Sequence, residues 1–149
     1  MKVLGLMSGT SADGVDAVLA EFLGAVSRPR WRILASAHHP YNPELRQRII
    51  QAGQGIPLTA GDWLALAEAI TEAQAQAARL CDPAGTAQLV GCHGQTVWHR
   101  PPDAERRGAS WQVLASSDTA QIPTRIGVIA VVRHQQYRSD RLRRELQRE

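Results

Sequence analysis

Residues 7–16 are Met7-Ser8-Gly9-Thr10-Ser11-Ala12-Asp13-Gly14-Val15-Asp16, and they directly follow the apolar run Val3-Leu4-Gly5-Leu6. An apolar run before a stretch rich in glycine, hydroxyl and carboxylate residues predicts a short strand that enters a loop. Glycine reaches backbone angles that are closed to other residues. We therefore expect Gly9 and Gly14 to let main-chain N–H groups turn toward an anion.

The side chains of this loop add two kinds of ligand. Ser8, Thr10 and Ser11 supply hydroxyl donors. Asp13 or Asp16 offers the oxygen ligands that hard cations prefer, directly or through a water molecule. Two interpretations stay open at this point. The stretch is either a nucleotide-phosphate site or an ordinary β-turn, because Gly, Ser, Asp and Thr are also the usual residues of turns.

A second segment supports the first interpretation. Residues 88–90 (QLV) read as a buried strand, and they precede Gly91-Cys92-His93-Gly94-Gln95-Thr96-Val97-Trp98-His99-Arg100-Pro101. Together, residues 7–19 (MSGTSADGVDAVL) and 91–101 (GCHGQTVWHRP) closely resemble the anhydro-N-acetylmuramic acid kinases, which belong to the sugar-kinase, heat-shock-protein and actin superfamily. The resemblance covers about residues 2–132 and is strongest at the two motifs.

The resemblance implies a fold, a reaction and a set of site residues. The fold would be α/β, the N-terminal half of an actin-like, ribonuclease H-like two-domain kinase, with a mixed sheet and flanking helices. The reaction would open the ring of 1,6-anhydro-N-acetylmuramic acid with water and phosphorylate the freed oxygen from ATP with Mg²⁺. The implied ATP phosphate-binding residues are Gly9, Thr10, Ser11, Ala12, Asp13, Gly14, Val15 and Asp16, and the implied sugar-binding residues are His93, Gln95 and Thr96.

The resemblance fails where the family carries its catalytic base. Members of the family follow the strand that corresponds to residues 127–132 with an Asp-Phe-Arg segment and a glycine-rich stretch, whereas this chain continues Arg133-His134-Gln135-Gln136. We therefore expect an incomplete actin-like domain over 1–132 and an atypical charged helical tail over 133–149. No catalytic residue is assigned, and the 149-residue chain is predicted to be an inactive, truncated kinase that binds nucleotide weakly. The alternative is a binding remnant or interaction module that holds nucleotide, sugar or a protein partner without turnover.

Composition limits the remaining function classes. Hydrophobic residues make up 44% of the chain and charged residues 21%, as in a globular protein, and the N-terminus shows no signal-peptide pattern. These features predict a cytoplasmic protein without a membrane span. The net charge of +3 comes from residues 133–149, which contain six arginines and three acidic residues. Nucleic-acid binding through this basic tail is therefore a third alternative. The strand expected over 127–132 is apolar on both faces, and apolar surface around it that no second domain covers predicts self-association.

Periodicity and turn residues predict the remaining elements. Alternation predicts a strand over 15–22, and apolar runs predict strands over 2–7, 87–91 and 127–132. Further strands are expected over 30–38 and 109–113. Helices are expected over 44–52, 118–124 and 139–149, and a long one from Thr59 to Leu80. For that helix, Thr59 and Asp62 predict a capping box, and the apolar face is expected to include Trp63, Ala67, Ile70, Ala73, Ala77 and Leu80. Cys81 and Cys92 lack the spacing of metal ligands and are expected to be buried thiols.

Overall fold

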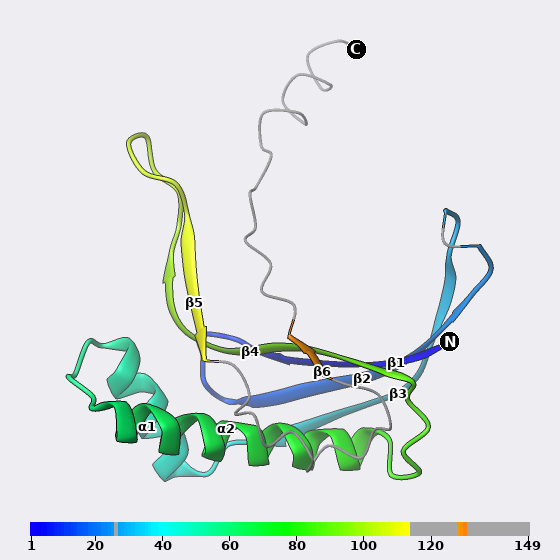
Figure 1. Ribbon diagram of the computed structural model, residues 1–149, viewed down its shortest axis with the longest axis horizontal. Helices are drawn as coiled ribbons and strands as arrows, with labels where there is room; N and C mark the ends of the chain where they lie inside the picture. The colour runs from blue at the N-terminus through cyan, green and yellow to red at the C-terminus, as the bar shows by residue number, and fades with distance from the viewer. Residues whose placement is uncertain (26, 114–127, 131–149) are drawn as a thin grey trace.

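The computed structural model describes residues 1–25, 27–113 and 128–130 of the chain. They form a mixed sheet with two helices on one of its faces (Figure 1). The elements in chain order are β1 (Lys2–Ser8), β2 (Gly14–Leu23), β3 (Arg30–Pro40), α1 (Pro43–Gly53), α2 (Ala60–Cys81), β4 (Leu89–Arg100), β5 (Ala109–Val113) and β6 (Val128–Ala130).

The sheet combines an antiparallel meander with a parallel pairing. β1, β2 and β3 pair antiparallel in sequence order, which confirms the predicted hairpin and third strand. After the two helices the chain returns as β4, parallel to β1, so that the strand order is β3-β2-β1-β4-β5. β6 pairs in parallel with residues 90–92 of β4, and β5 pairs antiparallel with residues 95–100 of the same strand. The predicted α/β class with a mixed sheet is confirmed.

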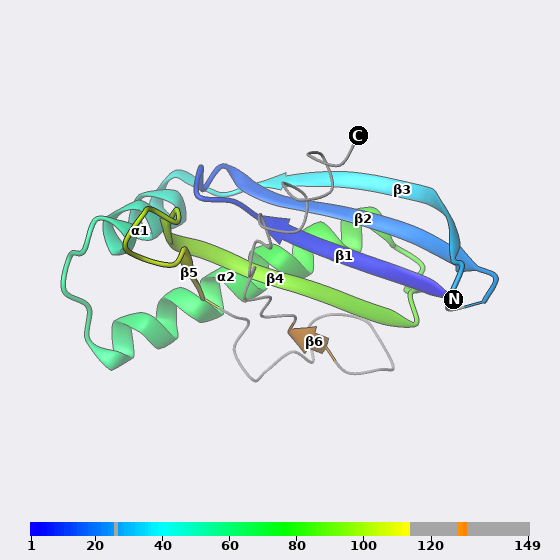
Figure 2. The ribbon, with the colours of Figure 1, turned by 90° about the horizontal axis from the view of Figure 1, so that it is seen from above.

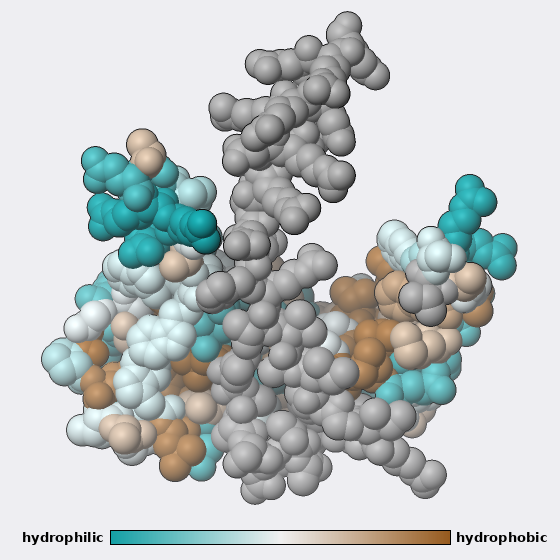
Figure 3. Space-filling model, turned by 45° about the horizontal axis from the view of Figure 1, so that its top comes forward, coloured by the Kyte–Doolittle hydropathy of each residue, from teal (hydrophilic) through white to brown (hydrophobic). Residues whose placement is uncertain are grey.

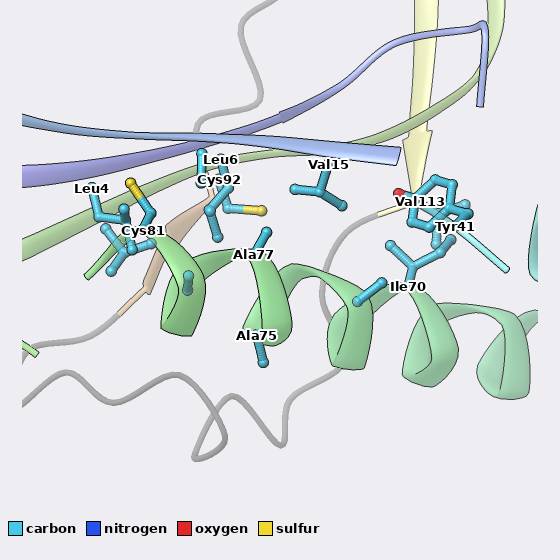
Figure 4. Close-up of a cluster of buried hydrophobic side chains, with 14 of the residues drawn as sticks. Leu4, Leu6, Val15, Tyr41, Ile70, Ala75, Ala77, Cys81, Cys92 and Val113 are labelled. Carbon is cyan, nitrogen blue, oxygen red and sulfur yellow. The ribbon is translucent and has the colours of Figure 1, made fainter. Parts of the chain in front are cut away.

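The hydrophobic core lies between the sheet and α2. This helix packs mainly on β2 and β3, while α1 contacts α2 and β4 (Figures 1 and 2). Leu4, Leu6 and Val15 point from the strands toward α2, and Leu4 lies beside Cys81 at the end of this helix (Figure 4). Small alanines on the helix allow this close approach to the sheet. Both cysteines are buried and free, as predicted.

The long helix begins as predicted, but one residue of its predicted apolar face is exposed. The Asp62 N–H donates to Thr59 Oγ1 at 3.2 Å, and the Thr59 N–H donates to Asp62 Oδ2 at 2.9 Å, so the capping box is confirmed. The assignment of Leu80 to the apolar face is wrong, because this side chain is 59% exposed and Cys81 is buried instead. Each residue turns a helix by about 100°, so a shift of one position moves a side chain off the core.

The second motif lies inside a strand and not in a loop after one. We predicted a strand over 87–91 that ends before His93, but β4 continues from Leu89 to Arg100. Gly91 and Gly94 lie within this strand and do not end it. Leu6 pairs with Cys92 and Ser8 pairs with Gln95, so β4 has one extra residue here, and Gly94 adopts a φ of 76°. This is a β-bulge, for which glycine is suited.

The face of the sheet away from the helices carries apolar side chains near the β2–β3 turn. Trp31 is 64% exposed and Ile33 is 58% exposed, and hydrophobic residues gather at this end of the upper face in Figure 3. Self-association, which was predicted for apolar surface around the strand at 127–132 and not for this patch, stays a prediction. No helix in the described ranges is long and apolar enough to cross a membrane. The helices predicted over 118–124 and 139–149, and the ends of the strand predicted over 127–132, lie outside the described residues.

Candidate functional site

The candidate phosphate loop is the connection between β1 and β2. It comprises residues 9–13, because Gly14, Val15 and Asp16 already belong to β2 and the Val15 side chain is fully buried in the core. Gly9 and Gly14 do not adopt positive φ values, which corrects the expectation about their backbone angles. The left-handed residue is Ala12, with a φ of 49° and only 1% of its surface exposed. The Ala12 N–H closes the turn on the carbonyl oxygen of Gly9 at 3.3 Å.

Three carbonyl groups around this loop accept hydrogen bonds from the interior of the protein. Gln95 Nε2 donates to the Gly9 oxygen at 2.7 Å, and the Tyr41 N–H donates to the Asp13 oxygen at 3.1 Å. Ser8 Oγ donates to the Gly14 oxygen at 3.0 Å. In contrast, the N–H groups of Thr10 and Ser11 donate to no other residue that the structure describes. The loop therefore presents free N–H donors, as an anion site requires.

A buried polar network lies behind the loop. Tyr41 Oη is 2.9 Å from Ser8 Oγ and donates to Gln95 Oε1 at 2.9 Å. Gln95 is fully buried, Ser8 is 2% exposed and Tyr41 is 6% exposed. The sequence motifs contain Ser8 and Gln95 but not Tyr41, which reaches the site from the end of β3. Its only sequence signal was its place between Pro40 and the N-cap Asn42, which identifies a strand end but no partner.

Burial of Tyr41 predicts an alkaline loss of stability. Desolvation raises the pKa of the Tyr41 hydroxyl to about 12, against a usual value of 10.0, although the hydrogen bond with Ser8 opposes this rise. The unfolded chain ionises first, so this contribution is complete below pH 10 and is lost as the pH rises from 10 to 12. The free energy of unfolding should fall by about 3 kcal/mol across this window. Urea unfolding at several pH values measures it.

The control for this prediction is Tyr41→Phe, which removes the ionisable group. Burial also raises the pKa of the Cys92 thiol, so the thiol contributes its own alkaline slope in both proteins. The informative quantity is therefore the difference between the two pH profiles. Equal slopes for the original chain and for Tyr41→Phe would contradict the assignment.

The outer side of the loop carries two carboxylates in different settings. Ser11 Oγ donates to Asp13 Oδ1 at 2.8 Å, and this hydrogen bond, followed by backbone N–H groups, lowers the pKa of Asp13. Asp13 is therefore an exposed, ionised carboxylate. Asp16 Oδ1 instead lies 2.9 Å from His38 Nδ1. Within the described part of the chain, no three His, Cys, Asp or Glu side chains are arranged to hold a metal ion.

A row of side chains crosses the open face of the sheet beside the loop. Met7 pairs with Asp16, and Asp16 pairs with His38, so these residues lie next to one another on β1, β2 and β3. The row continues to β4, where His93 is the first of the two bulge residues that lie opposite Met7. His93 Nδ1 is buried and has no hydrogen-bond partner among the described residues. His38 was not predicted, because its place in the row depends on strand register.

The structure brings the two motifs together but gives their residues different surroundings. Gln95 contacts the loop directly through Gly9, and its Nε2 also donates to the Thr96 oxygen at 2.9 Å. Gln95 and Thr96 are buried, whereas His93 is partly exposed. The parallel strands β1 and β4 both lead into this region, and the carboxyl ends of parallel strands are where α/β folds bind ligands.

Comparison with known proteins identifies the family. The sequence model of the anhydro-N-acetylmuramic acid kinases matches residues 1–139. The chain belongs to the anhydro-N-acetylmuramic acid kinase family. The described fold agrees with the N-terminal half of an actin-like sugar kinase. The match extends seven residues past the domain boundary expected at Val132, so the division of the chain at that point stays a prediction.

Individual relatives agree with this family membership. An anhydro-N-acetylmuramic acid kinase of Synechococcus sp. (strain CC9902) is 62% identical over 122 residues, covering 82% of this chain and 32% of that protein. One from Prochlorococcus marinus (strain MIT 9303) is 61% identical with the same coverage. One from Synechococcus sp. (strain CC9605) is 64% identical and covers 76% of this chain and 30% of that protein. The chain spans about a third of the length of these curated relatives.

Proposed function

We propose that this chain forms the nucleotide-phosphate side of an anhydro-N-acetylmuramic acid kinase. The observation that carries the proposal is the orientation of the loop at residues 9–13. Its flanking carbonyl groups are held from the interior, and the N–H groups of Thr10 and Ser11 are left without a partner among the described residues. Preorganised N–H donors stabilise the charge of a transferring phosphoryl group without reorganising. Membership in a kinase family supports a nucleotide substrate.

The loop also fits a role beside ATP and Mg²⁺, which the family implies. Mg²⁺ usually keeps several water ligands and takes one or two protein carboxylates in addition to phosphate oxygens. The exposed, ionised Asp13 fits that role directly or through water, and Asp16 fits it through Oδ2, because only Oδ1 contacts His38. When bound, ATP supplies the phosphoryl group and the ion offsets its charge. The cytoplasmic location belongs to this proposal, because ATP is available there.

For the amino sugar, we propose that His93 makes the direct contact. His93 is partly exposed, whereas Gln95 is buried and its amide is already hydrogen-bonded to protein atoms. The buried Gln95 and Thr96 would then hold the backbone of the sugar-binding segment in place without contacting the sugar. A neutral or charged imidazole can donate to a sugar hydroxyl, and a neutral one can also accept.

A polypeptide of these 149 residues is proposed to bind nucleotide weakly and to complete no turnover. The position where the family carries its base aspartate holds Arg133 and His134, so a carboxylate to activate water is missing there. A phosphate loop without the remaining walls of a kinase site also loses contacts and preorganisation. The second candidate is a non-catalytic nucleotide- or sugar-binding module, which the same loop would serve.

Two measurements on the purified 149-residue chain test the proposed nucleotide site and the proposed lack of turnover. We expect MgATP at millimolar concentration to shift the backbone amide resonances of Thr10 and Ser11, and we expect no sugar phosphate by ³¹P NMR when 1,6-anhydro-N-acetylmuramic acid is added. Formation of the sugar phosphate would refute the proposed inactivity. Unchanged Thr10 and Ser11 resonances would refute the nucleotide site. Salt-sensitive DNA binding would favour the basic tail.

A further inference from the structure

We propose that Gln95 is a positioning residue for the phosphate loop, and that its side-chain amide aims the Thr10 N–H at the bound anion. This inference rests on the proposed function of the loop. It gives Gln95 a role that differs from direct contact with the sugar. The residue belongs to the second motif, 86 positions away from Gly9 in the chain, yet it donates to the Gly9 carbonyl oxygen at 2.7 Å.

The peptide group between Gly9 and Thr10 transmits the effect. A trans peptide is planar, and its C=O and N–H point in opposite directions. The Gly9 oxygen faces inward to Gln95 Nε2 and to the Ala12 N–H, so both of its lone pairs are used. The Thr10 N–H must then point away from Gln95. Rotation of this peptide would break both hydrogen bonds at once.

Only an amide satisfies all the partners of this side chain. Nε2 donates to the Gly9 and Thr96 oxygens, and Oε1 accepts from the Tyr41 hydroxyl. A carboxylate would place a second acceptor against these two carbonyl oxygens. An apolar side chain would leave a carbonyl group buried with fewer partners. Because Gln95 is fully buried, water does not replace the missing donor easily.

The bulge in β4 explains how Gln95 reaches the loop. Without the extra residue, strand alternation would place Gln95 and Cys92 on opposite faces of the sheet, because side chains alternate along a regular strand. The positive φ of Gly94 and the register shift instead pair Gln95 with Ser8, with both side chains in the buried network. The glycines of the second motif thus place its glutamine behind the loop of the first motif.

The test compares Gln95→Met and Gln95→Glu with Tyr41→Phe. The two Gln95 variants lose the donor to Gly9. Tyr41→Phe keeps both Nε2 hydrogen bonds and removes the hydroxyl group that contacts Gln95 Oε1 and Ser8 Oγ. We expect the affinity for MgATP, measured from amide shifts, to fall about tenfold or more in both Gln95 variants, as for a lost hydrogen bond to a charged group. We expect a smaller loss in Tyr41→Phe, because both Nε2 hydrogen bonds of Gln95 remain.

Several outcomes would overturn the inference. Unchanged affinity in Gln95→Met would show that the amide does not position the loop. An equal loss in Tyr41→Phe would assign the effect to the stability of the whole network. If the original chain shows no shift with MgATP, the proposed function fails, but the Gly9 carbonyl ¹³C shift still tests the positioning, because it must change in Gln95→Met. If neither Gln95 variant folds, the side-chain NH₂ resonances of Gln95 in the original chain decide: they shift with MgATP if the inference holds and stay unchanged if it does not.

Discussion

Gly14→Ala should strongly destabilise the domain. A Cβ atom at Gly14 would overlap the carbonyl oxygen of His39 and would lie 2.8 Å from both His38 Cε1 and Pro40 Cα. Two of these three atoms are backbone atoms of the paired strand β3, so no side-chain rotation relieves the overlap. Overpacking of this kind costs about 1–3 kcal/mol or more, and here it breaks the β2–β3 ladder beside the loop. A domain with about 5–15 kcal/mol of total stability tolerates little of this.

Circular dichroism and the dispersion of the amide NMR spectrum measure the effect of Gly14→Ala. Gly5→Ala is the matched control, because Gly5 also lies in a strand, and within the part of the chain that the structure describes a Cβ there would approach only the Val18 oxygen, at 3.9 Å. We expect the control to keep the spectrum of the original chain. A Gly14→Ala variant with the same spectrum and the same urea midpoint would show that β3 moves aside without cost.

The two loop glycines show a limit of sequence interpretation. From the sequence, Gly9 and Gly14 have the same explanation, namely backbone freedom around an anion. In the structure neither has a positive φ, and Gly14 is required because β3 passes close to it. The close approach depends on the pairing of Gly14 with Pro40, which lies 26 residues away. No local pattern encodes that distance.

Local signals predicted most of the fold correctly. Local sequence patterns predicted β1, β2, β3 and β5, and the Thr59–Asp62 pair predicted the start of α2, because these features depend on residues close in sequence. The course of β4 was missed, because Gly91 and Gly94 are typical of a loop and only pairing to β1 on one side and β5 on the other keeps the strand extended.

The candidate site was predicted as two motifs and is one connected structure. The residues that join the motifs were either unassigned, as for Tyr41, or assigned to the sugar, as for Gln95. Both act through hydrogen bonds between segments far apart in the sequence, Tyr41 with Gln95 and Gln95 with Gly9. Such contacts follow from the register of β1 on β4, which the sequence of either strand alone does not specify.

Gly9→Val should abolish nucleotide binding and leave the fold intact. Among the described residues, a Cβ at Gly9 would meet only Ser11 Oγ, at 3.7 Å, which is an ordinary contact, and the φ of Gly9 is not positive. The added side chain therefore costs little within the protein. It stands at the first residue of the loop, where phosphate oxygens must come close to main-chain N–H groups, and glycine permits that approach because it has no side chain.

The measurement is a titration of the Gly9→Val chain with MgATP, in which we expect the Thr10 and Ser11 amide shifts to disappear while the urea midpoint stays unchanged. Gly9→Ala gives an intermediate case, since a single methyl group obstructs less of the approach. Retained shifts in Gly9→Val would place the phosphates elsewhere and remove the main support for the proposed site. Loss of folding in this variant would instead contradict the open space seen around Gly9. Together with Gly14→Ala, the experiment separates a glycine required for ligand approach from one required for strand packing.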